Sequence, residues 1–122
     1  MRFTLPALRS TLATTAVALA LGGCASLLTG GPLIKNPNDP KGMIVIENRT
    51  REPVKSVLIS SCSANTYGLN RMKKNERVYG GGTRGFEVSA GCWDVMAGND
   101  NDAPRRRLNV PAGGQAVYRV GG

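Results

Sequence analysis

The sequence predicts an all-β protein, a small antiparallel β-sandwich of six to seven short strands that is immunoglobulin-like or a half-open barrel. Three observations lead to this prediction. Short runs of β-branched or alternating apolar residues recur from residue 43 onward. Clusters of glycine, proline, asparagine and aspartate separate these runs. No long stretch of this region has the periodicity of an amphipathic helix.

The first two strands are expected at residues 43–47 and 54–60. Both are rich in valine and isoleucine, which fit a pleated, half-buried surface. The stretch between them is turn-prone and ends in Pro53, whose missing N–H is tolerated at the start of a strand. We therefore expect these two strands to pair with each other as antiparallel neighbours.

Four further strands are expected after an irregular region, residues 61–82, in which residues 69–74 form either a helical turn or a short irregular strand. In each later strand, residues at every second position share a face. Trp93 belongs to such a series, so we interpret it as a core anchor rather than a ligand platform. The expected series are Phe86 and Val88; Trp93, Val95 and Ala97; Arg106, Leu108 and Val110; and Ala116, Tyr118 and Val120.

The first 23 residues have the layout of a secretory signal. Arg2 and Arg9 make the start basic, and residues 12–21 form an apolar run about half as long as the ~20 residues of a transmembrane helix. The run ends in Leu21-Gly22-Gly23-Cys24, which resembles the lipobox of bacterial lipoproteins. The resemblance implies removal of residues 1–23 as a lipoprotein signal peptide and a lipid on the Cys24 thiol. Cleavage before an ordinary cysteine is the alternative interpretation.

The lipoprotein resemblance also implies where the protein is held. Two or three acyl chains, palmitate among them, make a membrane anchor effectively permanent. Members of the lipoprotein family that stay in the inner membrane often carry an aspartate after the cysteine, whereas this chain has Ala25. The expected localisation is therefore the outer membrane, with the protein on its periplasmic side.

Residues 24–42 are predicted to be a lipidated flexible tether, and residues 43–122 the folded domain. Three prolines and three glycines in residues 25–42 prevent a continuous helix or an interior strand. Leu33 and Ile34 in this stretch either pack back on the domain or move freely, and the sequence leaves both possibilities open.

The chain has three cysteines. If Cys24 carries lipid, Cys62 and Cys92 remain as a pair, and an exported protein is expected to oxidise such a pair to a disulfide. Two buried thiols are the alternative. Because the chain has no histidine and no further cysteine, we predict no zinc site.

The formal net charge is +8, and 14 basic residues face 8 acidic ones once Arg2 and Arg9 leave with the signal. Such charge favours anionic lipid head groups, lipopolysaccharide phosphates or acidic polymers. Nucleic acid also matches it physically, but an exported protein rarely meets nucleic acid, so none is expected as a partner. Our preferred interpretation is that the basic residues are solvated and keep an exposed sheet edge from pairing with other chains, and the alternative is an anion-binding patch. The candidate residues are Arg71, Lys73, Lys74, Arg77, Arg105, Arg106 and Arg107.

Two loops offer weaker signals. Asn99-Asp100-Asn101-Asp102 presents oxygen ligands for calcium, but Ala103-Pro104 departs from the EF-hand pattern, so a simple turn is preferred and no metal is predicted. Tyr67 and Gly68 are candidates for a partner contact, because loops carry most binding sites.

A three-part pattern runs through the domain. It consists of a strand ending in Asn48, the loop Tyr67-Gly68-x-Asn70, and the strand start Gly91-x-Trp93-Asp94. This pattern resembles small secreted β-sandwich domains of uncharacterised bacterial proteins. The resemblance implies the fold and brings no established activity. The cysteine pair is not part of it, so the expected disulfide depends on the residues alone.

No catalytic residues are predicted. Histidine is absent, the carboxylates are scattered, and the serines lack a neighbouring base. We therefore expect a non-catalytic outer-membrane lipoprotein without a cofactor other than its lipid, whose periplasm-facing β-sandwich is an envelope structural or protein-interaction module. The alternative is a module that binds an anionic ligand, such as lipopolysaccharide phosphate or an acidic glycan, through the arginine-rich strand.

Overall fold

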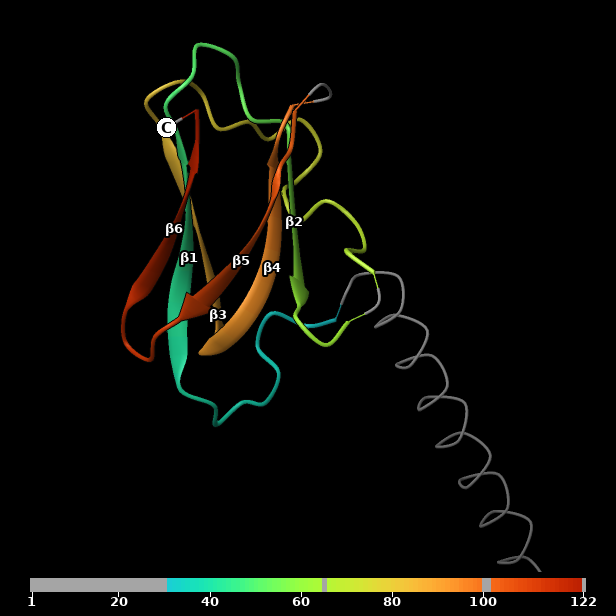
Figure 1. The fold of residues 1–122 in the computed structure, drawn as a ribbon, viewed down its shortest axis with the longest axis vertical. Coiled ribbons are helices and arrows are strands. Elements are labelled where there is room, and N and C mark those ends of the chain that lie inside the picture. The colour runs from blue at the N-terminus through green and yellow to red at the C-terminus, as the bar shows by residue number, and fades with distance from the viewer. Residues whose placement is uncertain (1–30, 65, 100–101, 122) are drawn as a thin grey trace, which may run out of the picture.

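The computed structural model describes residues 31–64, 66–99 and 102–121, which form six strands and no helix. The strands are β1 (Lys41–Asn48), β2 (Ser56–Ser61), β3 (Thr83–Ser89), β4 (Gly91–Gly98), β5 (Arg105–Val110) and β6 (Gln115–Val120). They make two three-stranded sheets, in the orders β3-β1-β6 and β2-β4-β5, which face each other (Figure 1). The predicted small all-β sandwich is confirmed.

The pairing of the first two strands differs from the prediction. β1 and β2 lie in different sheets, because β1 pairs with β3 and β6 whereas β2 pairs with β4. Among the described strands β1 and β6 form the one parallel pair, and the other pairs are antiparallel. The expected hairpin between residues 43–47 and 54–60 was therefore wrong.

The buried Asn48 explains why the chain leaves the first sheet after β1. Its side-chain Nδ2 donates to the backbone oxygens of Glu52 (2.7 Å) and Val78 (2.8 Å), and its Oδ1 accepts from the backbone N–H of Thr50 (2.9 Å). These bonds turn residues 49–53 away from the sheet instead of back along β1. Val54 then pairs with Val78 before β2 begins in the second sheet.

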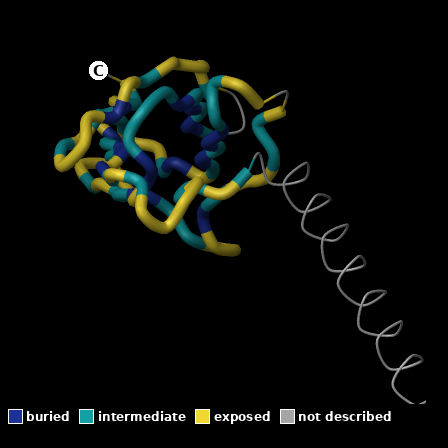
Figure 2. Tube along the Cα trace, turned by 90° about the horizontal axis from the view of Figure 1, so that it is seen from below, coloured by how far each residue is buried: buried dark blue, intermediate teal, exposed yellow. Residues whose placement is uncertain are grey.

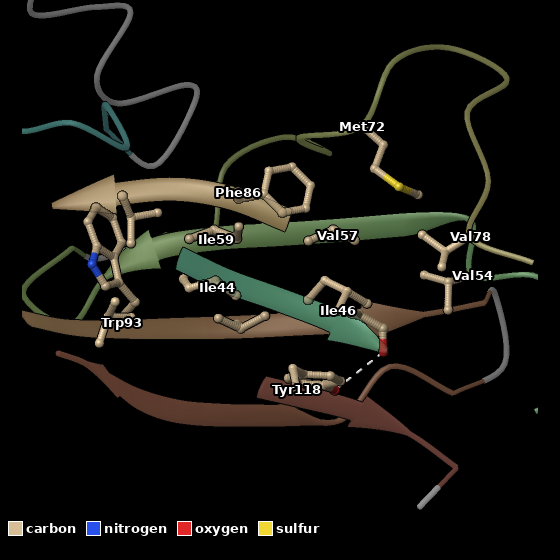
Figure 3. Packing of buried hydrophobic residues seen from close by; sticks show 14 residues of the cluster. Ile44, Ile46, Val54, Val57, Ile59, Met72, Val78, Phe86, Trp93 and Tyr118 are labelled. Carbon is tan, nitrogen blue, oxygen red and sulfur yellow. Dashed lines mark hydrogen bonds between the residues drawn. The ribbon is translucent and has the colours of Figure 1, made fainter. Parts of the chain in front are cut away.

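The core lies between the two sheets, where the buried residues gather (Figure 2). Ile44, Ile46 and Tyr118 come from the first sheet and meet Trp93 and other apolar side chains of the second (Figure 3). Trp93 is fully buried, and its indole N–H donates to the backbone oxygen of Ser89 over 2.8 Å. Its interpretation as a core anchor is confirmed.

The sheets approach each other at one side through β5 and β6, and the other side, between β2 and β3, is closed by irregular chain (Figure 1). Asn70 covers the free edge of β2, because its Oδ1 accepts the N–H of Val57 (2.9 Å) and its Nδ2 donates to the oxygen of Lys55 (3.1 Å). The next residues add the buried side chain of Met72 to the core. An unpaired strand edge is thereby covered.

The boundary between tether and domain also differs from the prediction. β1 begins at Lys41, two residues before the expected strand, and residues 31–40 contact the sandwich. Of the two apolar residues whose placement was left open, Leu33 packs against the core. The expected tether of residues 24–42 was therefore too long at its C-terminal end, and its first part, residues 24–30, lies outside the described residues.

Candidate functional site

The predicted disulfide is present. The Sγ atoms of Cys62 and Cys92 lie 1.91 Å apart, with their Cα atoms at 5.6 Å. The bond follows from the antiparallel register of β2 and β4. Ser61, the last residue of β2, lies opposite Trp93, so the next residue, Cys62, comes opposite Cys92. It therefore joins the ends of two neighbouring strands and closes a loop between residues 30 apart in sequence.

Residues 31–40, which we call the docked arm, close the sandwich at the disulfide end. The backbone N–H of Ser89 donates to the oxygen of Leu33 (2.9 Å), and the N–H of Lys35 donates to the Ser89 hydroxyl (2.8 Å). The Lys35 ammonium lies 4.8 Å from the centroid of the Trp93 ring and donates to the Ser61 hydroxyl at 3.0 Å. The arm thus bridges β3 and the end of β2, with its lysine over the indole.

Arg71, one of the predicted anion-binding residues, is bound to the protein's own backbone. Its guanidinium donates to the oxygen of Ile59 from Nε (3.2 Å) and Nη2 (2.7 Å), and to the oxygen of Gly31 over 2.7 Å. Burial lowers the pKa of Arg71 because it disfavours the charged form. Arg71 therefore fastens the start of the docked arm to β2 and has little capacity left for an external anion.

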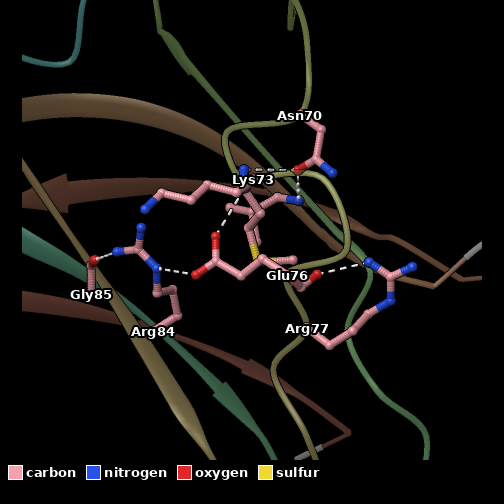
Figure 4. Close-up of polar contacts among 8 residues, drawn as sticks. Asn70, Lys73, Glu76, Arg77, Arg84 and Gly85 are labelled. Carbon is pink, nitrogen blue, oxygen red and sulfur yellow. Dashed lines mark hydrogen bonds and ion pairs between the residues drawn. The ribbon is translucent and has the colours of Figure 1, made fainter.

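Lys73 and Arg77 of this loop and Arg84 of β3 lie around Glu76 (Figure 4). The Glu76 carboxylate accepts from the backbone N–H of Lys73 (2.9 Å) and from Nε of Arg84 (2.9 Å), and these contacts lower its pKa. Arg77 donates to the Glu76 backbone oxygen at 2.8 Å. The side chains of Lys73 and Lys74 are exposed. This part of the patch consists of two solvent-facing lysines beside a structural loop.

The arginines of β5 alternate as predicted but have different surroundings. Arg106 shares the inner face with the core positions, where its guanidinium lies 4.9 Å from the centroid of the Tyr118 ring. Arg107, on the outer face, forms an ion pair with Asp94 at 2.9 Å, and this hydrogen bond raises the pKa of Arg107. Arg105 is exposed.

The seven predicted basic residues do not form one patch. Asn70, which precedes the loop group, lies along the free edge of β2, whereas β5 is the opposite edge of the same sheet. The structure therefore separates Arg71, Lys73, Lys74 and Arg77 from Arg105, Arg106 and Arg107.

Tyr67 and Gly68, the candidates for a partner contact, are partly buried and do not protrude from the surface. Tyr67 is half-buried, and its buried hydroxyl has no hydrogen-bond partner among the described residues. Gly68 has a φ of 71°, in the left-handed region that favours glycine, so it bends the loop. The residue that does protrude is the next one, Leu69, with 63% of its surface exposed. The sequence offered a signal that we missed, an isolated leucine in a polar loop.

The loop considered for calcium behaves as a turn where it is described. The Asn99 amide donates to the Glu52 carboxylate (2.7 Å), and its Oδ1 accepts the backbone N–H of Asp102 (3.1 Å). The two remaining candidate ligands, Asp100 and Asn101, lie outside the described residues. A hollow of about 530 Å³ opens beside this turn. Its lining residues are Thr50, Arg51, Glu52, Pro53, Val54, Asn99, Asp102, Val120 and Gly121.

A second surface was not anticipated. Met43, Val45 and Val117, which we call the apolar strip, lie on the outer face of sheet β3-β1-β6, where Val45 and Val117 are register partners. Met43 is 37% exposed, and its methyl group lies over Gly85, where a Cβ would come within 2.6 Å of it. The signal was the unbroken apolar run at residues 43–46, which is typical of a strand covered on both faces.

The apolar strip is flanked at one end by a group of ion-paired side chains. Glu47 forms ion pairs with Arg49 at 2.6 Å and with Arg119 at 3.5 Å. The hydrogen bond from Arg49 is the main cause that lowers the pKa of Glu47. This face of the molecule is therefore apolar at its centre and carries at one end an ion-paired group with one positive charge in excess.

Comparison of the chain with protein-family models, curated proteins and solved structures found no match. Within residues 31–64, 66–99 and 102–121, no helix is both long and apolar enough to cross a membrane. The same residues contain no group of three or more histidine, cysteine, aspartate or glutamate side chains placed to hold a metal ion.

Proposed function

We propose that this chain is a bacterial lipoprotein that is cleaved before Cys24, acylated on that residue with palmitate among its chains, and held on the periplasmic side of the outer membrane. The pairing of Cys62 with Cys92 carries the proposal. It leaves the cysteine of the lipobox as the one thiol without a disulfide partner, and disulfides persist in oxidising compartments outside the cytoplasm.

The docked arm supports a close attachment. Gly31, the seventh residue after Cys24, already accepts a hydrogen bond from Arg71. Seven residues span at most about 25 Å even when fully extended. An acylated Cys24 would therefore hold the sandwich beside the membrane, without a long tether.

The proposed role is a non-catalytic, envelope-structural one, in which the apolar strip contacts a second envelope protein. At residues 43–46, β1 is apolar on both faces, and the outer face leaves Met43, Val45 and Val117 partly exposed. The nearby Glu47 forms ion pairs with two arginines. A protein surface with an apolar centre complements this face better than a phosphate or a lipid head group does.

The alternative function, anion binding through the arginine-rich strand, receives less support from the geometry. Arg106 stacks on Tyr118, and Arg107 is paired with Asp94. Among the three arginines of β5, that leaves Arg105 as the exposed side chain outside such contacts. A polyanion held by one side chain would bind weakly and would be released by moderate salt.

Lipidation is tested by growing cells on labelled palmitate and measuring the mass of the purified protein. We expect label on the wild-type protein and a mass that corresponds to residues 24–122 plus acyl chains. Cys24→Ala should abolish the label and release the protein from the membrane fraction. An unlabelled wild-type protein would overturn the proposed function.

The protein contact is tested by photo-crosslinking in intact cells, with a photoreactive residue at Gln115 beside the apolar strip. We expect a single crosslinked protein partner that disappears in a Val117→Lys variant. Asn109→Lys is the matched control, because Asn109 is exposed on the outer face of the other sheet. A crosslink unaffected by Val117→Lys, or no crosslink at all, would count against the apolar strip as the contact surface.

A further inference from the structure

We infer that the free-edge side of β2 is a membrane-contact surface that rests on anionic phospholipid head groups around the anchor. We call its residues Lys35, Leu69, Lys73 and Lys74 the basic edge. The inference rests on the proposed acylation of Cys24, and it adds the orientation of the sandwich and the lipid class that it contacts.

The first argument is where the described chain begins. Gly31 is held by Arg71, whose other bonds go to the oxygen of Ile59 in β2. The chain toward Cys24 therefore starts beside the middle of β2 and its covering loop, not at either end of the sandwich. With at most about 25 Å of chain to the acylated residue, this side is the one nearest to the bilayer.

The second argument is charge. All eight acidic residues lie outside residues 53–75, a stretch that carries Lys55, Lys73 and Lys74 besides the backbone-bound Arg71. The next residue, Glu76, forms an ion pair with Arg84. Residues 24–38 add Lys35 and no acidic residue. These two stretches form the side of the molecule next to Gly31, because Lys35 bonds to Ser61 and Arg71 bonds to Gly31. Basic residues close to a bilayer are attracted by its anionic lipids.

The third argument is Leu69. It is 63% exposed and lies two residues before Arg71, in the loop that covers the β2 edge. In water such a side chain gains nothing from its exposure, whereas at a membrane interface it can enter the region between head groups and acyl chains. An exposed leucine in the same loop as two exposed lysines, Lys73 and Lys74, is the composition expected of an interfacial contact.

The contact is tested with the full, acylated protein, after mass measurement has shown the acyl chains. Leu69→Trp is reconstituted into vesicles of phosphatidylcholine and phosphatidylglycerol with brominated acyl chains, which quench nearby tryptophan. The emission of wild-type Trp93 is subtracted. We expect strong quenching of the added tryptophan in Leu69→Trp and little in the matched control Asn109→Trp, at the far edge of the same sheet.

A second pair of variants tests the role of charge. Lys73→Gln and Lys74→Gln are combined in the Leu69→Trp background. The ratio of molecules whose basic edge contacts the bilayer to molecules in other orientations should fall by roughly fivefold per lysine. Arg51→Gln with Arg105→Gln removes the same charge from exposed positions away from the basic edge and should leave quenching unchanged. Vesicles of phosphatidylcholine alone should give weak quenching throughout.

The outcomes separate this inference from the proposed function. If the protein carries acyl chains but positions 69 and 109 are quenched equally, or neither is quenched, the basic edge does not face the bilayer, while acylation of Cys24 stands. Quenching that is the same in phosphatidylcholine alone refutes the anionic-lipid contact. A protein without acyl chains would overturn both proposals.

Discussion

The indole N–H of Trp93 in β4 donates to the backbone oxygen of Ser89 at the end of β3, over 2.8 Å. This bond crosses from one sheet to the other at the end of the sandwich that carries the disulfide. Ser89 also receives the docked arm, because its N–H and hydroxyl bond to residues 33 and 35. One tryptophan thus links the core, both sheets and the arm.

Replacement of Trp93 by phenylalanine should lower the free energy of unfolding by about 2–4 kcal/mol. The variant loses buried volume and leaves the oxygen of Ser89 without its donor in the core. Urea unfolding followed by circular dichroism measures the change. A loss below about 0.5 kcal/mol would contradict the assignment of Trp93 as the core anchor.

Removal of the disulfide should cost about 3–4 kcal/mol in the Cys62→Ala, Cys92→Ala double variant, because the bond restricts the unfolded chain between residues 30 apart. Thermal unfolding of the variant and of the wild type, each with and without reductant, measures this. Reductant should destabilise the wild type alone. Equal stability of the variant and the wild type in the absence of reductant would show that the bond contributes nothing.

Substitution of the buried Asn48 by alanine should destabilise the protein by at least about 2 kcal/mol. The N–H of Thr50 loses its acceptor, and the oxygens of Glu52 and Val78 each lose one of two donors. Asn109→Ala, on an exposed strand position, is the control and should change stability by less than about 0.5 kcal/mol. Similar losses of stability in both variants would contradict the conclusion that the hydrogen bonds of Asn48 stabilise the turn after β1.

Stability should fall with acidification as Glu76 and Glu47 become protonated. Contacts with Lys73 and Arg84 lower the pKa of Glu76, and contacts with Arg49 lower the pKa of Glu47, from an ordinary value of 4.5. A carboxylate whose folded pKa is depressed stabilises the protein above its unfolded pKa, and this stabilisation is lost as pH falls through the folded pKa.

The measurement is the urea midpoint from neutral pH down to values well below 4.5. Glu76→Gln should be less stable than the wild type at neutral pH, and its midpoint should fall less steeply as the solution is acidified. Parallel curves for the two proteins would show that the Glu76 carboxylate does not contribute to the acid sensitivity.

The later strands could be predicted from the sequence because each has a period of two. Residues 83–89 form β3 as expected, and the inward turn of Arg106 follows from its spacing to Leu108 and Val110. The partnership of β1 could not be predicted in this way. Strand propensity says nothing about which strands pair, and the turn after β1 depends on Asn48 bonds to a residue 30 positions away.

Of the candidate site, the cysteine pair could be predicted from the sequence, whereas the contacts of Arg71 and the exposure of Leu69 could not. Cys62 and Cys92 could be paired from the sequence because Cys24 was expected to carry lipid, which left two of the three cysteines. Arg71 was counted with the surface cations, but its bonds go to the backbone oxygens of Ile59 and Gly31. Every residue has such an oxygen, so the sequence carries no sign of which one an arginine will bind. Leu69 was overlooked because a single apolar residue in a loop has no periodicity.

The parallel pairing of β1 with β6 affects when this chain can fold. β1 is the central strand of its sheet, and one of its two neighbours is β6, residues 115–120, which follows the other described strands in the chain. Until those residues arrive, the inner face of β1 lacks Tyr118 beside Ile46. Contacts between distant parts of a chain also form slowly. If the chain is exported as we propose, this pairing keeps the first sheet from being completed before residues 115–120 have been synthesised.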